Sequence, residues 1–186
     1  MRGFLEWLGG TEGSRALLES QYAWPLIESA HVMGVALFLG TVIVGDLRLA
    51  GIGFTSIRPD EVLRRMRPFV LSGFGVMVLT GVLIFYSNPV RYYHDLFFRA
   101  KMGLIFVAVL NAFLFHRAAR LGNRGGVRPG IAVSAWGAAA ISLTVWALVV
   151  VAGRLIAYNW FACDIQPQPG WVNKLAGCPV TAAASP

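Results

Sequence analysis

The chain has 186 residues, of which 56% are hydrophobic and only 13% are charged. Soluble domains carry about 25% charged residues, so this composition excludes an ordinary soluble domain. The formal net charge of +7 comes from Arg and Lys residues that flank long uncharged stretches, which favours membrane topology over a nucleic-acid surface. We therefore expect a multi-pass protein whose main partner is the lipid bilayer, with no nucleic-acid partner.

Residues 1–21 precede the first long apolar stretch and contain Phe4, Leu5, Trp7 and Leu8. They lack the uninterrupted apolar region and the small-residue cleavage site of a signal peptide. We expect a short helix that lies along the outer surface of the membrane.

Four apolar stretches are each near or above the ~20 residues that a helix needs to cross the hydrocarbon core. They run over about 23–47, 68–87, 97–116 and 130–158, within a transmembrane domain of residues 22–160. Asn88-Pro89 is expected to stop the second span. The sequence thus predicts an all-α membrane protein built as a four-transmembrane-helix bundle.

Arginines between the spans predict the orientation of the bundle. They concentrate in the loops after the first and third spans, at Arg48, Arg58, Arg64, Arg65, Arg67, Arg117, Arg120, Arg124 and Arg128. By the positive-inside rule these loops are cytoplasmic, so both termini are periplasmic in a bacterial inner membrane. The periplasmic tail, residues 161–186, contains Cys163 and Cys178, for which a disulfide fits an oxidising compartment and two unpaired thiols are the alternative.

The first span carries two ionisable residues, Glu28 and His31, which lie on one helix face at a spacing of i,i+3. Gly34 continues this face and allows a flat ligand or another helix to approach. Because ionisable groups within a span are costly, they are candidates for a functional site. A ligand or metal site and a packed Glu–His pair in a helix interface both remain open.

The third span carries Lys101, Asn111 and His116, and His94 precedes it. Lys101 either faces the site or extends its ammonium to the outer surface. Asn111 is too deep for that and must form a hydrogen bond across the bundle. His116 is either a metal ligand or an interfacial histidine, and His94 is expected near the outer boundary.

Two other polar groups are less specific. Small residues in the second span, including Ser72, Gly73, Gly75, Thr80 and Gly81, indicate close helix packing. Arg154, near the outer end of the fourth span, is expected to pair with Glu28 or with lipid phosphate.

Several short strings resemble a group of small bacterial inner-membrane proteins. They are Trp24-Pro25-Leu26-Ile27-Glu28-Ser29-Ala30-His31-Val32-Met33-Gly34, Asp46-Leu47-Arg48-Leu49, Leu79-Thr80-Gly81, Phe98-Arg99-Ala100-Lys101-Met102, Asn111 and Phe115-His116. The group includes the copper resistance protein D family, the HemJ-type protoporphyrinogen oxidases and an uncharacterised four-helix family, to which the likeness is greatest. Similarity to the first implies copper passage. Similarity to the second implies a b-type haem held by a first-span histidine, at the position of His31, with Lys101 at the place of a third-span lysine.

The two candidate cofactors make different demands on the sequence. His31 and His116 differ in depth by roughly 10 Å at 1.5 Å per residue, which is too much for opposite sides of one haem iron. His31 would then act with His94, Met102 or Met77, or alone. Copper(I) prefers thioether and thiolate ligands, yet the five methionines form no repeated pattern.

Three functions therefore remain open. The first is a haem b-binding electron-transfer subunit that acts with quinone or a periplasmic redox protein, in which Glu28 orients His31. The second is copper or small-solute transport along Glu28, His31, Lys101 and Asn111. The third is a non-catalytic membrane scaffold subunit in a homo- or hetero-oligomer. The motifs of hydrolases, phosphate loops, zinc sites and dinucleotide folds are absent from the sequence, so no set of catalytic side chains is expected.

Overall fold

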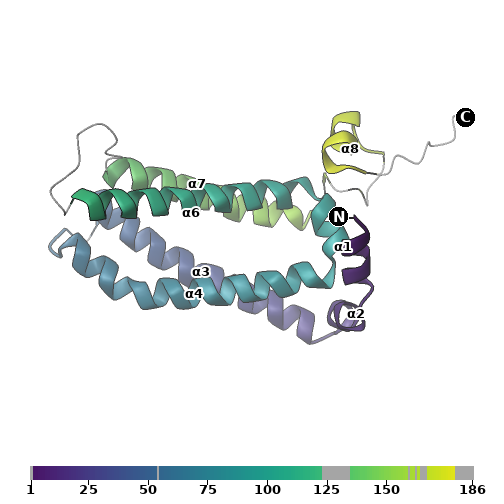
Figure 1. The fold of residues 1–186 in the computed structure, drawn as a ribbon. Helices are drawn as coiled ribbons and strands as arrows, with labels where there is room; N and C mark the ends of the chain where they lie inside the picture. The colour runs from purple at the N-terminus through teal and green to yellow at the C-terminus, as the bar shows by residue number, and fades with distance from the viewer. Residues whose placement is uncertain are drawn as a thin grey trace, which may run out of the picture.

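The computed structural model describes residues 2–53, 55–122, 135–158, 160–161, 163 and 167–178. All regular structure in these residues is helical (Figure 1). Four helices are long and apolar enough to cross a bilayer, namely α3 (Ala23–Leu49), α4 (Pro59–Ser87), α6 (Leu96–Gly122) and α7 (Ala135–Ile156). Four short helices accompany them, α1 (Arg2–Gly9), α2 (Glu12–Glu19), α5 (Pro89–His94) and α8 (Gly170–Ala176). The predicted all-α bundle of four transmembrane helices is confirmed.

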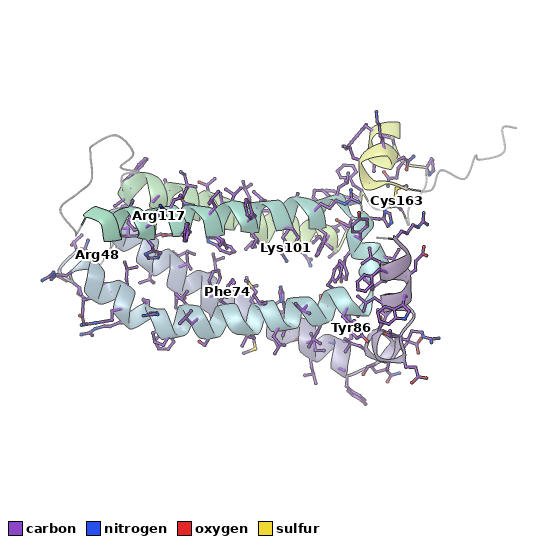
Figure 2. The ribbon with its side chains drawn as sticks, viewed as in Figure 1. Arg48, Phe74, Tyr86, Lys101, Arg117 and Cys163 are labelled. Carbon is purple, nitrogen blue, oxygen red and sulfur yellow. A yellow bond between two sulfur atoms is a disulfide. The ribbon has the colours of Figure 1, made fainter. Side chains whose placement is uncertain are left out.

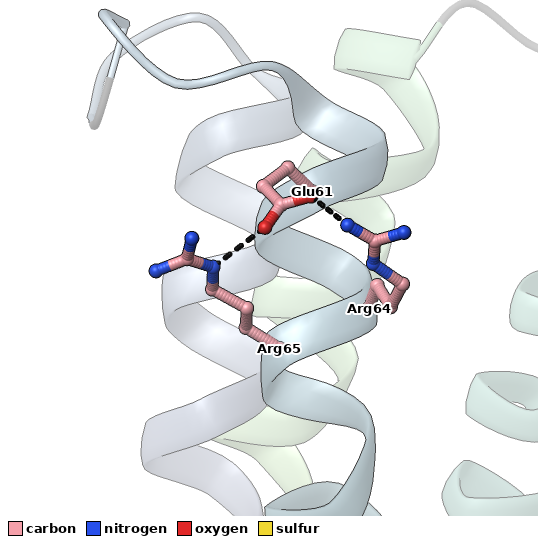
Figure 3. A network of polar contacts seen from close by, with 3 residues as sticks. All are labelled: Glu61, Arg64 and Arg65. Carbon is pink, nitrogen blue, oxygen red and sulfur yellow. Dashed lines mark hydrogen bonds and ion pairs between the residues drawn. The ribbon is translucent and has the colours of Figure 1, made fainter.

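The second long helix begins earlier than the sequence predicts. Helix α4 starts at Pro59, not at residue 68, and Pro68 lies inside it. Pro59 occupies the first turn, where a missing N–H removes no helical hydrogen bond. Glu61 then accepts hydrogen bonds from Arg64 and Arg65 on the following turn (Figure 3). These pairs support helical turns that continue beyond the apolar stretch.

The other predicted boundaries agree more closely with the structure. The predicted start of the fourth span, residues 130–134, lies outside the described residues, and α7 ends at Ile156. Asn88 ends α4 as expected, and its side chain accepts a hydrogen bond from the Arg91 N–H to begin α5. The chain thus turns at this point through a short helix.

The spans form two antiparallel hairpins. Helix α3 packs along α4, α6 packs along α7, and contacts between α3 and α7 join the two pairs (Figure 1). The core lies at the centre of the bundle and includes Phe38, Met77, Ala108, Trp146 and Val149. The rings of Phe38 and Trp146 meet edge to face with centroids 4.8 Å apart. This apolar layer separates the two ends of the bundle.

Two glycines bring α3 and α4 into close contact. A Cβ on Gly34 would lie 3.1 Å from the backbone nitrogen of Met77, and one on Gly73 would lie 2.7 Å from that of Phe38. The predicted packing role of the small residues in the second span therefore holds at Gly73. A Cβ on Gly75 would meet no atom within 4 Å, so this neighbouring glycine is not part of the contact.

The N-terminal helices are attached to the end of α4 that lies next to α5. Thr11 caps α2 and its hydroxyl lies 2.8 Å from the Tyr86 hydroxyl. Ser14 donates a hydrogen bond of 2.8 Å to the Tyr86 carbonyl. Phe4 and Trp7 remain exposed, as expected for helices at a membrane surface. Two short helices thus replace the single one that the sequence predicts.

The C-terminal tail is attached at the same end. Cys163 and Cys178 form a disulfide with their Cα atoms 5.2 Å apart, which confirms the predicted pairing. The Nδ1 of His94 donates to the Ala176 carbonyl at 2.7 Å, and Arg99 donates to the Leu175 carbonyl at 2.6 Å. Figure 2 shows Cys163 and Tyr86 at this end and Arg48 and Arg117 at the opposite end.

The contact at Gly73 gives a test of the α3–α4 packing. We expect Gly73→Ala to lower the free energy of unfolding by about 1–3 kcal/mol, because the new methyl group overlaps the Phe38 backbone. The matched control Gly75→Ala should be neutral or slightly stabilising, since its methyl group enters open space and Ala favours a helix. Denaturant or thermal unfolding in detergent measures both, and equal effects would contradict the proposed contact.

Candidate functional site

His31 lies on α3 in the half of the bundle that carries the short helices. Its Nδ1 is 2.9 Å from the Thr80 hydroxyl oxygen on α4. The single hydroxyl hydrogen of Thr80 is donated to the Val76 carbonyl at 2.6 Å. The Met77 carbonyl lies 3.3 Å from the same hydroxyl, and Met77 also forms a backbone hydrogen bond with the His31 ring. With the Thr80 hydrogen on a helix carbonyl, Thr80 accepts from His31, and the proton of the neutral imidazole is on Nδ1. The other ring nitrogen, Nε2, keeps a free lone pair.

Backbone packing on one side holds the imidazole in place. A Cβ on Gly81 would lie 3.3 Å from the His31 Cε1 atom, so any other residue at position 81 would crowd the ring. Thr80 is buried and His31 is half-buried. Gly34 lies one turn further along α3, and α4 occupies the space beside it. This glycine therefore leaves no flat surface for a ligand.

Lys101 approaches the same level of the bundle from α6. Its Nζ lies 3.4 Å from the position that a Cβ on Gly153 of α7 would take, so the ammonium reaches across to the fourth span. The side chain is half-buried, and its positive charge acts on the His31 imidazole. Figure 2 places Lys101 between the two ends of α6. Residues from all four spans thus meet at one depth in the bundle. They are His31, Thr80 and Lys101, together with Gly153, which the Lys101 ammonium approaches.

The charge of Lys101 has no counter-ion among the residues that the structure describes. In the described part of the chain, no carboxylate forms an ion pair with it and no acceptor forms a hydrogen bond to it. An ammonium that is half removed from water loses hydration without compensation. The site is therefore electropositive and suits an anionic group.

Glu28 departs from the expected arrangement. Its side chain is exposed on α3, so Glu28 does not form the packed pair with His31 in a helix interface that was one of the two expectations. Burial raises the pKa of the Tyr92 phenol on α5, Arg91 opposes this rise, and the negative charges of Glu28 and Asp95 add to it. The guanidinium of Arg154 lies 5.2 Å from the Tyr158 ring centroid, which is the contact it makes in place of Glu28.

The remaining predicted site residues lie elsewhere. Asn111 donates a hydrogen bond of 3.0 Å to the Ala138 carbonyl on α7, which is the expected bond across the bundle. His116 is exposed and its ring contacts Phe115, while His94 holds the tail. No group of three His, Cys, Asp or Glu residues that could hold a metal occurs among the described residues. The three histidines are thus separate.

Sequence reasoning missed two residues that the structure makes notable. Thr80 was interpreted only as a packing residue, although it determines which nitrogen of His31 is free. Asp46 was named only as part of a string that resembles a known family, yet this residue of α3 is buried in the structure. The rule that ionisable residues within a span are functional candidates would have selected Asp46.

Replacing Lys101 tests whether the site carries an uncompensated charge. We expect Lys101→Met to raise the free energy of unfolding of the ligand-free protein by about 1–3 kcal/mol, because a half-buried ammonium without a partner is costly. The control Lys174→Met removes the exposed lysine of α8 and should leave stability unchanged. Unfolding curves in detergent compare the two. A loss of stability in Lys101→Met would contradict this description of the site.

One family model matches the chain, over residues 3–159. The match includes all four spans with His31, Thr80, Lys101 and Asp46, and it ends before the disulfide-closed tail. A comparison with curated proteins finds no match, and a comparison with solved structures finds none either. The matched part is well over half of the chain. The protein therefore belongs to the family of unknown function DUF6644.

Proposed function

We propose that this protein binds a b-type haem through His31 and acts as an electron-transfer component of the bacterial inner membrane. The observation that carries the proposal is the bond between His31 Nδ1 and Thr80, which leaves the Nε2 lone pair free. Haem iron takes a neutral imidazole as an axial ligand. A hydrogen bond from the second ring nitrogen is the usual way in which proteins orient such a ligand.

The charge at the site also fits this cofactor. The propionate groups of haem are carboxylates, and the Lys101 ammonium lacks a carboxylate partner in the part of the chain that the structure describes. A bound propionate would compensate the charge of Lys101, while Thr80 would hold the His31 ring in its orientation. When bound, the haem supplies one-electron chemistry, and the protein supplies orientation and electrostatics.

Related proteins enter this proposal only by resemblance. We propose kinship with the copper resistance protein D and HemJ-type proteins, from the strings around His31 and Lys101. Copper transport receives less support from the contacts, because Met33 and Met102 are exposed and Met77 packs in the apolar core. A quinone or a periplasmic redox protein is the proposed electron partner.

The proposed orientation places the short helices and the disulfide in the periplasm. Arg48 and Arg117 lie at one end of the bundle and the disulfide at the other, as the positive-inside rule requires for this arrangement. An oxidising periplasm also favours the disulfide.

Reporter fusions test this orientation. Alkaline phosphatase, which folds only when exported, should be active when fused after residue 186 and inactive when inserted at residues 55–57 in the loop between α3 and α4. A cytoplasmic fluorescent reporter at the same positions should give the reciprocal pattern. An active phosphatase at residues 55–57 would reverse the proposed topology.

The haem proposal is tested by visible absorption spectra of the purified protein. Expression with added haem precursor should give a Soret band and reduced-state bands after dithionite. His31→Ala should abolish them because the axial ligand is lost. His116→Ala, which removes an exposed histidine at the opposite end, should retain them. A colourless wild-type protein under these conditions would refute haem binding, and stoichiometric copper by elemental analysis would then support transport.

A further inference from the structure

A second polar position lies at the opposite end of the bundle from His31. Asp46 is on α3, about 22 Å further along the helix axis at 1.5 Å per residue. Its residue surface is only 9% exposed, and its Oδ2 atom is buried without a hydrogen-bond partner. The Ser142 hydroxyl on α7 forms a hydrogen bond to the carboxyl group. Among the described residues, Ser142 is thus the one polar partner of this carboxyl group.

Charged groups near this end do not compensate Asp46. On α3, Arg48 donates to the Ile57 carbonyl at 2.6 Å. On α4, Glu61 is occupied by Arg64 and Arg65, and Arg67 is exposed. On α6, His116 and Arg117 are exposed, and the described part of α7 carries no charged side chain before Arg154 at its other end. None of these groups forms an ion pair with Asp46 among the described residues.

The physical consequence follows from the cost of burying charge. An ionised carboxylate removed from water costs several kcal/mol unless a cation or several donors compensate it. One serine hydroxyl supplies a single donor, and Oδ2 has none. Binding one proton converts the group to a neutral carboxylic acid and removes most of this cost. The surroundings of Asp46 therefore favour the protonated form.

We propose that Asp46 is a proton-binding site that keeps its proton at mildly acidic pH, where exposed carboxyl groups are already ionised, while it packs against Ser142. The site lies on α3 near Arg48, at the cytoplasmic end of the span in the proposed topology. A proton would therefore travel only a short distance between Asp46 and the cytoplasm. The apolar layer that contains Phe38 and Trp146 separates it from His31. Proton binding at Asp46 is thus independent of whether His31 binds haem.

Labelling with dicyclohexylcarbodiimide tests the proposal, because this apolar reagent modifies protonated carboxyl groups within membranes. We expect mass spectrometry of the purified full chain to find the adduct on Asp46 at mildly acidic pH and progressively less of it as the pH rises. Glu61 serves as an internal control. It accepts hydrogen bonds from Arg64 and Arg65, and these two positive charges favour its ionised form. It should remain unlabelled.

Infrared spectroscopy provides a second measurement that does not depend on access of the reagent. The carbonyl band of a protonated carboxyl should be present in the wild type at mildly acidic pH and absent in Asp46→Asn. This variant should fold with the same melting temperature, because the amide resembles the neutral acid in shape. The control Glu61→Gln, which changes a carboxylate held by two arginines, should retain the band. Absence of the wild-type band would overturn proton binding.

Discussion

The close approach of α3 and α4 is the constraint on which the candidate site depends. At Gly34 and Gly73 the backbones are so near that a side chain on either glycine would meet the facing helix. In a bilayer, where lipid tails are as apolar as the side chains, such close packing is a main source of helix association. It places His31, one turn before Gly34, against Thr80 and Gly81 of α4.

The hydrogen bond between His31 and Thr80 is the chemical consequence of this packing. Thr80 has one hydroxyl hydrogen and gives it to the Val76 carbonyl of its own helix. With that hydrogen on the carbonyl, the imidazole donates through Nδ1, and Nε2 is the nitrogen with the lone pair. A packing contact between two helices thus determines which atom of the histidine is able to bind a ligand. Lys101 adds positive charge at the same level from the second hairpin.

Polar groups are distributed toward the two ends of the bundle, with an aromatic and aliphatic layer between them. His31, Thr80 and Lys101 lie toward the short helices, and Asp46 with Ser142 lies toward Arg48. The layer between these positions is built from apolar and aromatic side chains that include Phe38 and Trp146, and no hydrogen bond of the described residues joins His31 to Asp46. If an electron at His31 and a proton at Asp46 affect each other, the effect would act through long-range electrostatics or through helix movement. It would not pass along a continuous chain of hydrogen bonds.

The sequence by itself determined the class of the protein. Four apolar stretches predict four spans because water is absent from the bilayer core and only long helices satisfy their backbone there. It also predicted the disulfide, the stop at Asn88-Pro89 and the cross-bundle bond of Asn111, because each depends on local chemistry or on depth. The start of α4 was missed, because hydropathy shows only where the apolar part of a helix begins. Helix α4 begins earlier, at Pro59, and its first turns include Glu61 paired with Arg64 and Arg65.

Only the tertiary structure decided which polar residues meet. Helical periodicity placed Glu28 and His31 on one face, but in the fold Glu28 is exposed and only His31 meets α4, at Thr80. The same periodicity gave no indication that Lys101 reaches Gly153 on α7 or that Asp46 meets Ser142. These contacts join residues far apart in sequence, and they depend on side-chain volumes at the helix crossings. One sequence does not show directly which side chains pack against each other at these crossings.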